Sequence, residues 1–205
     1  MRTPLLNSYL GFVATALLVS ACGSAGPPPR HYVLGELAPI RPASPSESDF
    51  PIVEVKSVRV PDFLDTTQIV TRRAGGEIVA SQSAQWGERL SIGVTRTVAL
   101  SLAGSLPQLA VTTSPPLDAP RWQVLIDIDA FDAQLNGSCT LMARWSIWEG
   151  RGNKKINEGR LLLTEPVGTG TDAHVVAAMN REVDQLANRI AQQLELDARR
   201  SLASR

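Results

Sequence analysis

The sequence has little of the chemistry on which enzymes and metal sites depend. Of its 205 residues only two are cysteine and two are histidine, and aromatic residues make up 5%. The 20 basic and 20 acidic residues cancel, so no basic excess indicates binding to nucleic acid. The length suits one domain with a hydrophobic core of its own.

Catalytic and cofactor motifs are also missing from the sequence. His31 and His174 stand outside any metal-ligand spacing, and there is no P-loop, nucleophile elbow or dinucleotide-binding glycine pattern. We therefore expect no metal site, no cofactor and no enzymatic activity. Asp127 and Asp129, about 7 Å apart on one strand face, leave a periplasmic hydrolase as an alternative, although a solvated outer face explains them as well.

The N-terminus has the layout of an export signal. Arg2 supplies positive charge, and the mostly apolar run Leu5–Val19 is too short for a membrane span, which needs ~20 apolar residues. The run ends in Val19-Ser20-Ala21-Cys22, which resembles the lipobox of bacterial lipoproteins. In that motif the cysteine is acylated and the chain is cut before it. We predict a signal peptide over residues 1–21 and lipid attachment at Cys22; a buried N-terminal helix with an inert cysteine is the alternative.

Acylation of Cys22 would fix the location of the protein. Bacterial lipoproteins carry three acyl chains, palmitate among them, and two or more chains hold a protein stably on a bilayer. Gly23, not Asp, follows the cysteine. By resemblance to Gram-negative lipoproteins, this favours the periplasmic face of the outer membrane. Cys139 then has no partner for an internal disulfide, and its alternating apolar segment predicts that it is buried.

Composition divides the remaining chain into a tether and a domain. Residues 22–51 are rich in Pro, Ser and Gly and predict a lipid-anchored flexible tether, within which residues 31–37, HYVLGEL, form a short apolar patch suited to an edge strand. The folded domain is predicted over residues 52–200.

Alternation and turn residues predict six strands in this domain. Two of them flank Gly75-Gly76 as a hairpin, and the last three form an antiparallel meander. In residues 122–132, Ala130 is expected on the same face as Ile128, with Phe131 on the opposite face. The predicted strands are 52–60, 67–73, 77–83, 122–132, 139–150 and 154–166.

Helical periodicity appears in two segments. Residues 86–106 carry an apolar stripe at Leu90, Val94, Val98 and Leu102, and a second stripe begins after Asp172, a plausible N-cap. It consists of Val176, Met179, Val183, Leu186, Ile190 and Leu194. The order of elements predicts an α+β fold: an antiparallel sheet of about five to six strands with two long helices packed on one face.

The segment 58–72, VRVPDFLDTTQIVTR, is unusual for a strand connection. Loops are usually polar, yet this one carries Phe63 and Leu64 between Pro61, Asp62 and Asp65. The apolar pair either packs into the core or is offered to a partner. Trp145 and Trp148 fall on opposite faces of one strand, so one of them is also a candidate for an interaction surface.

These segments resemble the ABC-type transport auxiliary lipoprotein family. The matching residues lie in HYVLGEL (Tyr32, Leu34), in VRVPDFLDTTQIVTR and in QWGERL around Trp86, with Phe63 where Tyr is commoner and Gly87 where Ala is commoner. The resemblance implies a non-enzymatic, outer-membrane component of an MCE/ABC-type lipid transport system. Its partner would be a periplasmic MCE-domain protein, with the permease and ATPase as indirect partners.

The expected partner-binding residues are Pro61, Asp62, Phe63, Leu64, Asp65 and Trp86. Replacement of Phe63 and Leu64 by charged residues is expected to cause loss of that partner or envelope defects, with the fold intact. A lipoprotein that activates a cell-wall synthase or assists lipopolysaccharide export is the alternative, and a homo-oligomer stays open because exposed apolar loops can pair between copies.

Overall fold

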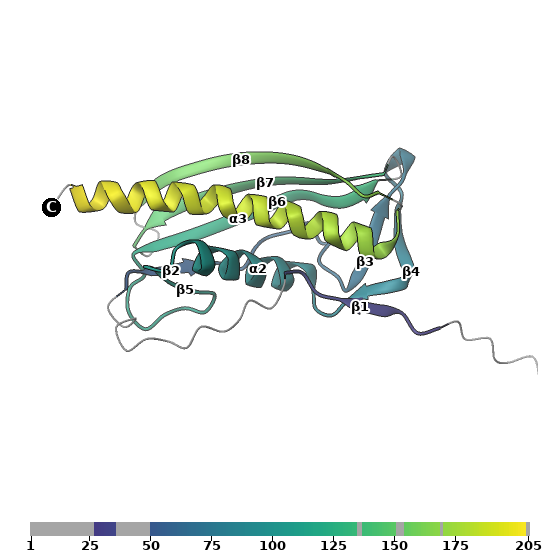
Figure 1. The fold of residues 1–205 in the computed structure, drawn as a ribbon, viewed down its shortest axis with the longest axis horizontal. Helices are drawn as coiled ribbons and strands as arrows, with labels where there is room; N and C mark the ends of the chain where they lie inside the picture. The colour runs from purple at the N-terminus through teal and green to yellow at the C-terminus, as the bar shows by residue number, and fades with distance from the viewer. Residues whose placement is uncertain (1–26, 36–49, 135–136, 151–153, 169, 204–205) are drawn as a thin grey trace, which may run out of the picture.

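The fold is described from a computed structural model, which describes residues 27–35, 50–134, 137–150, 154–168 and 170–203. A mixed sheet of eight strands carries two long helices on one of its faces (Figure 1). The α+β class with two helices is thus confirmed. The predicted purely antiparallel sheet of five to six strands is wrong, because there are more strands and several pairs are parallel.

Three long strands form the predicted antiparallel meander. β6 (Trp122–Gln134), β7 (Ser138–Glu149) and β8 (Lys154–Pro166) pair antiparallel over almost their whole lengths. Their order places β8 at one margin of the sheet (Figure 1).

The other side of β6 is shared by two short groups of strands. β2 (Ile52–Val55) and β3 (Gln68–Arg72) both run parallel to β6, β2 along its first half and β3 near its end. Parallel pairing needs a long crossover connection, and the chain between β3 and β6 contains a helix. The sequence-based prediction assumed that successive strands are antiparallel neighbours, and it therefore missed these parallel pairs.

The remaining strands complete these two groups. β4 (Ile78–Trp86) forms the predicted hairpin with β3, and the turn between them, Ala74–Gly76, uses positive φ angles of 77° and 85° at Gly75 and Gly76. β5 (Ala110–Thr112) pairs with β2. β1 (Arg30–Tyr32) pairs parallel with β4, so the interval predicted as a tether contains one strand of the sheet.

Both predicted helices are present and bury their predicted stripes. α2 (Leu90–Ser105) and α3 (Asp172–Ala203) pack on each other and on the same face of the sheet (Figure 1). The stripe residues of both helices are at most 6% exposed. Among the described residues, no helix combines the length and apolar character required to cross a bilayer.

A β-bulge changes which residues of β6 face the helices. The register with β7 shifts between Ile128 and Ala130, and beyond it Phe131 and Ala133 are buried at 0% and 1% exposure. One extra residue inverts the alternation. The expectation that Ala130 continues the inner face and Phe131 the outer face is therefore wrong.

Candidate functional site

The three segments that carry the family resemblance meet at the start of α2. The Gly87 N–H donates to the Tyr32 carbonyl at 2.7 Å, and the Trp86 N–H donates to the Thr67 carbonyl at 2.8 Å. Arg96 then joins the Glu88 carboxylate at 2.7 Å and the Leu34 carbonyl at 2.8 Å. Residues that the sequence separates by more than fifty positions thus build one junction between β1, β4 and α2.

Asp65 caps α2 from a distance. The residue before the helix, Arg89, makes no side-chain cap bond, and the Asp65 carboxylate instead accepts from the Ser91 N–H at 3.0 Å and pairs with the Arg89 guanidinium. Burial raises the pKa of the Asp65 carboxyl, but the hydrogen bonds from Ser91 and Arg89 outweigh it and hold that pKa below its ordinary value. Asp65 therefore fixes the 61–65 loop to the helix.

The 61–65 loop divides its two apolar side chains between the core and solvent. Its backbone turns back on itself, with the Leu64 N–H donating to the Pro61 carbonyl at 2.9 Å. Leu64 is 1% exposed, whereas Phe63 is 41% exposed. The Arg72 guanidinium lies 5.3 Å from the centre of the Phe63 ring. Of the predicted apolar pair, Leu64 packs into the core and Phe63 stays accessible.

The other predicted partner-binding residues also differ in how far they are exposed. Trp86 is 3% exposed and belongs to the core, so its side chain has no free surface for a partner. Pro61 and Asp62 flank Phe63 on the loop, half-buried and exposed respectively. The loop thus offers Phe63 on a backbone that Leu64 and Asp65 hold in place.

The face of the sheet turned away from the helices is lined by charged pairs. Arg144 binds Asp129 through two hydrogen bonds of 2.9 and 3.1 Å, and Arg59 binds Asp127. The two carboxylates proposed for a hydrolase are therefore each occupied by an arginine. This arrangement gives no support to acid–base catalysis by Asp127 and Asp129.

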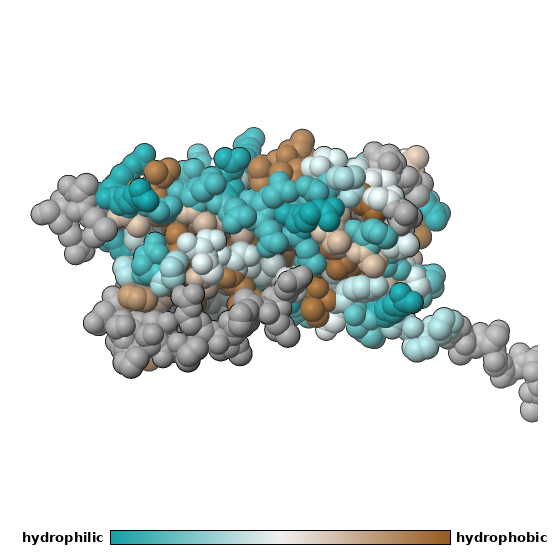
Figure 2. Space-filling model, in the orientation of Figure 1, coloured by the Kyte–Doolittle hydropathy of each residue, from teal (hydrophilic) through white to brown (hydrophobic). Residues whose placement is uncertain are grey.

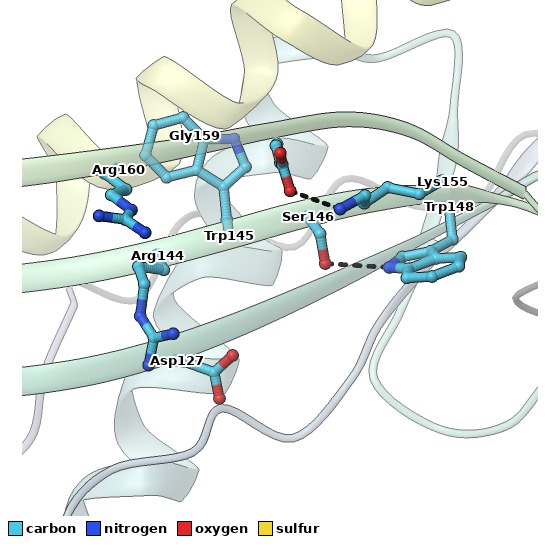
Figure 3. A pocket seen from close by; sticks show the side chains of 9 residues that line it. Asp127, Arg144, Trp145, Ser146, Trp148, Lys155, Gly159 and Arg160 are labelled. Atoms are coloured by element: carbon cyan, nitrogen blue, oxygen red, sulfur yellow. Dashed lines mark hydrogen bonds and ion pairs between the residues drawn. The ribbon is translucent and has the colours of Figure 1, made fainter.

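A shallow pocket of about 390 Å³ lies among these pairs (Figure 3). Trp148 contributes to it, half-buried, with its indole N–H donating to the Ser146 hydroxyl at 2.9 Å. Trp145, by contrast, is buried and its ring crosses Gly159, where a Cβ would stand 2.2 Å from the nearest ring atom. Gly159 is therefore required for this packing, and Trp148 is the tryptophan of the strand that meets the open face.

Next to the charged pairs, two apolar side chains on the same face are exposed. Met142 and Leu162 lie directly opposite each other on β7 and β8 and are 43% and 65% exposed. Arg72 reaches the same face, where it holds the buried Asp132 carboxylate through two bonds of 2.8 Å. Phe63 is exposed and lies beside Arg72, which links the 61–65 loop to this charged pair.

The opposite, helix-covered face contains an acidic residue that sequence reasoning missed. Glu182 is 0% exposed, and among the described residues neither carboxylate oxygen has a hydrogen-bond partner. Burial raises the pKa of Glu182 to about 7, and the Glu165 carboxylate adds to this shift. Glu182 stands three residues after Met179 and four before Leu186, so its position on the apolar stripe was the available signal.

The buried thiol of Cys139 lies close to Glu182. Cys139 is 0% exposed, which confirms the expectation of a core residue. Burial and the neighbouring Glu182 both raise the pKa of the Cys139 thiol above its ordinary value. The thiol therefore stays protonated, which disfavours a role as a nucleophile.

The remaining predictions about the site concern metal binding and lipid attachment. Over the described ranges, no group of three or more His, Cys, Asp or Glu side chains is placed to hold a metal ion. His174 lies at the start of α3, with its Nδ1 2.5 Å from the Thr171 hydroxyl. Cys22 and the signal peptide lie outside the described residues.

Comparison with known proteins assigns the chain to a family. The family model for the ABC-type transport auxiliary lipoprotein component matches residues 32–191. No curated protein matches the chain.

Two solved structures share the fold. The first is an uncharacterized protein that is 17% identical, with 81% of this chain and 98% of that one covered and a TM-score of 0.69. The second, from Xanthomonas campestris, is 15% identical, with 82% and 99% covered and a TM-score of 0.61.

Proposed function

The chain belongs to the family of ABC-type transport auxiliary lipoprotein components, and we propose that it serves an MCE/ABC-type lipid transport system as the outer-membrane component that docks the periplasmic MCE-domain protein. In this role it supports lipid transport between the two membranes and the integrity of the envelope. It acts by binding and carries out no reaction of its own.

The observation that supports docking is the way Phe63 is presented. An exposed aromatic side chain contributes most to binding when it is held rigidly, because little conformational freedom is then lost on association. Leu64 anchors the loop from below and Asp65 ties it to α2, so Phe63 is fixed on both sides. We propose Pro61, Asp62 and Phe63 as contact residues, with Leu64, Asp65 and Trp86 supporting them.

The lipid anchor at Cys22 would bring the domain close to the membrane. β1 begins at Arg30, eight residues after Cys22. Extended chain spans ~3.3 Å per residue, so β1 lies at most about 26 Å from the acylated cysteine. The margin of the sheet formed by β1 and β4 would then face the outer membrane.

A charge at position 63 tests the docking role. Phe63→Glu is expected to lower co-purification of the MCE-domain protein from crosslinked envelopes by about tenfold or more, with the thermal unfolding midpoint retained. Leu196→Glu is the matched control, because Leu196 is 47% exposed on α3. Undiminished co-purification of Phe63→Glu would reject the loop as docking site.

The identity of the partner tests the function as a whole. Recovery of a cell-wall synthase or a lipopolysaccharide-export protein by the wild-type chain, in place of an MCE-domain protein, would overturn the proposed function.

A further inference from the structure

β8 is a long strand with an open edge. Within the described part of the chain it pairs only with β7, so the backbone N–H and C=O groups along its other side have no strand to pair with. The strand comprises 13 residues, whereas β1 and β5, which end the other two groups of strands, comprise three each. A backbone edge of this length is a template for an added strand.

The side chains along β8 guard this edge only in part. Edge strands are usually protected by charges, prolines or bulges. On β8 the charges and the bulge next to Lys155 lie mainly in the first half of the strand, whereas the run Leu161-Leu162-Leu163 is uncharged and the single proline stands at the last position, Pro166. Leu162 is 65% exposed, and Figure 2 shows apolar atoms along the margin where β8 runs.

A positive charge lies beside this run of three leucines. Arg160 and Arg144 are directly opposite each other on β8 and β7, a like-charge pair that destabilises a sheet unless anions balance it (Figure 3). Arg144 is balanced by Asp129, but exposed Arg160 makes no hydrogen bond or ion pair with any residue the structure describes. Glu158, two residues earlier on β8, is bound by Lys155 at 2.6 Å, and the charge of Arg160 is only the smallest of the causes that lower the pKa of Glu158.

We propose that β8 receives an extended segment of another protein as an added strand, with an acidic side chain of that segment beside Arg160 and an aliphatic one beside Leu162. Backbone hydrogen bonds would provide affinity, and alternate side chains would provide specificity. The proposal concerns a binding mode and surface distinct from the 61–65 loop, and it does not depend on the proposed transport role.

A second copy of this chain fits the edge less well. In an antiparallel pair centred on Leu162, Thr164 of one copy would stand opposite Arg160 of the other, which leaves the charge unbalanced. A pair centred on Gly159 would set Glu158 opposite Arg160, but the bulge at Ile156 would then bring Lys155 opposite Leu162. Neither register gives Arg160 an acidic partner and Leu162 an aliphatic one.

Site-specific photocrosslinking in the full-length, membrane-bound protein tests the proposal. A benzoyl-phenylalanine crosslinker at position 162 is expected to form an adduct with a different protein, within an extended segment that carries an acidic residue. The same crosslinker at position 196 on α3, also exposed, is the control for random encounter. Arg160→Glu is expected to reduce the adduct about tenfold, and reversal of the partner's acidic residue to arginine should restore it.

Three results would overturn the proposal: an adduct between two copies of this chain, an adduct no stronger than that at position 196, or an adduct that Arg160→Glu leaves unchanged. Because Arg160 is exposed, a retained unfolding midpoint would show that its replacement leaves the fold intact. Loss of the MCE-domain protein in Phe63→Glu together with an intact adduct at position 162 would support both surfaces independently.

Discussion

The two faces of the β6–β8 sheet differ in what their side chains accomplish. The helix-covered face is apolar and closed, and it buries residues such as Phe131, Leu141 and Ile147 completely. The opposite face combines ion pairs with exposed Met142 and Leu162, and no described helix packs on it. The comparison indicates that stability resides on the first face and that the second is available for binding.

Adjacent residues of β7 provide the strongest test of this contrast. Leu141→Ala removes a fully buried side chain and is expected to lower the free energy of unfolding by about 3 kcal/mol or more. Met142→Ala, one residue further and on the other face, is expected to change it by less than about 0.5 kcal/mol. Chemical denaturation measures both, and equal losses would contradict the assignment of the faces.

Glu182 is the exception on the closed face, and its effect depends on pH. Folding raises the pKa of Glu182 from 4.5 to about 7, so the folded protein holds this proton more tightly than the unfolded chain does. The resulting contribution to stability is fully present below pH 4.5 and is lost as the pH rises to about 7. The loss approaches about 3 kcal/mol. Denaturation between pH 4.5 and 8 should show this decline in the wild type and its absence in Glu182→Gln, and parallel curves would refute it.

Arg72 is the exception on the open face. Its removal would leave the 2% exposed Asp132 carboxylate unpaired, and since Arg72 itself is 34% exposed we expect Arg72→Met to cost about 2 kcal/mol of stability. Arg144→Met breaks a pair in which both side chains are exposed and screened by solvent, and should cost clearly less than Arg72→Met. Thermal or chemical unfolding of the two variants side by side would detect the difference; similar losses would show that burial of the partner does not matter here.

Local patterns in the sequence predicted the local elements well. The hairpin at Gly75-Gly76, the meander and the stripes of α2 and α3 each depend on alternation or periodicity within one segment, and all are present. The parallel pairing of β2 and β3 with β6 depends on contacts between distant segments and left no such pattern. The bulge at Ile128–Ala130 reversed an alternation that continued without interruption in the sequence.

The candidate site was predictable only in part, for a related reason. The apolar character of Phe63 and Leu64 marked the loop, but only the fold shows which of the two is buried. Asp65 caps a helix that begins 25 residues later, and the signal was indirect: Gly87, Glu88 and Arg89 precede α2 without the usual Ser, Thr, Asp or Asn. The open edge of β8 is a property of the whole sheet and follows from its strand order alone.

The central claim is that partners bind the side of the sheet left uncovered by the helices. Hydrogen–deuterium exchange of the full-length protein, alone and with the purified MCE-domain protein, tests it most directly. The account predicts slower exchange in residues 61–65 upon binding, with the outward surfaces of α2 and α3 unchanged. Slower exchange confined to the two helices, with residues 61–65 unaffected, would contradict it.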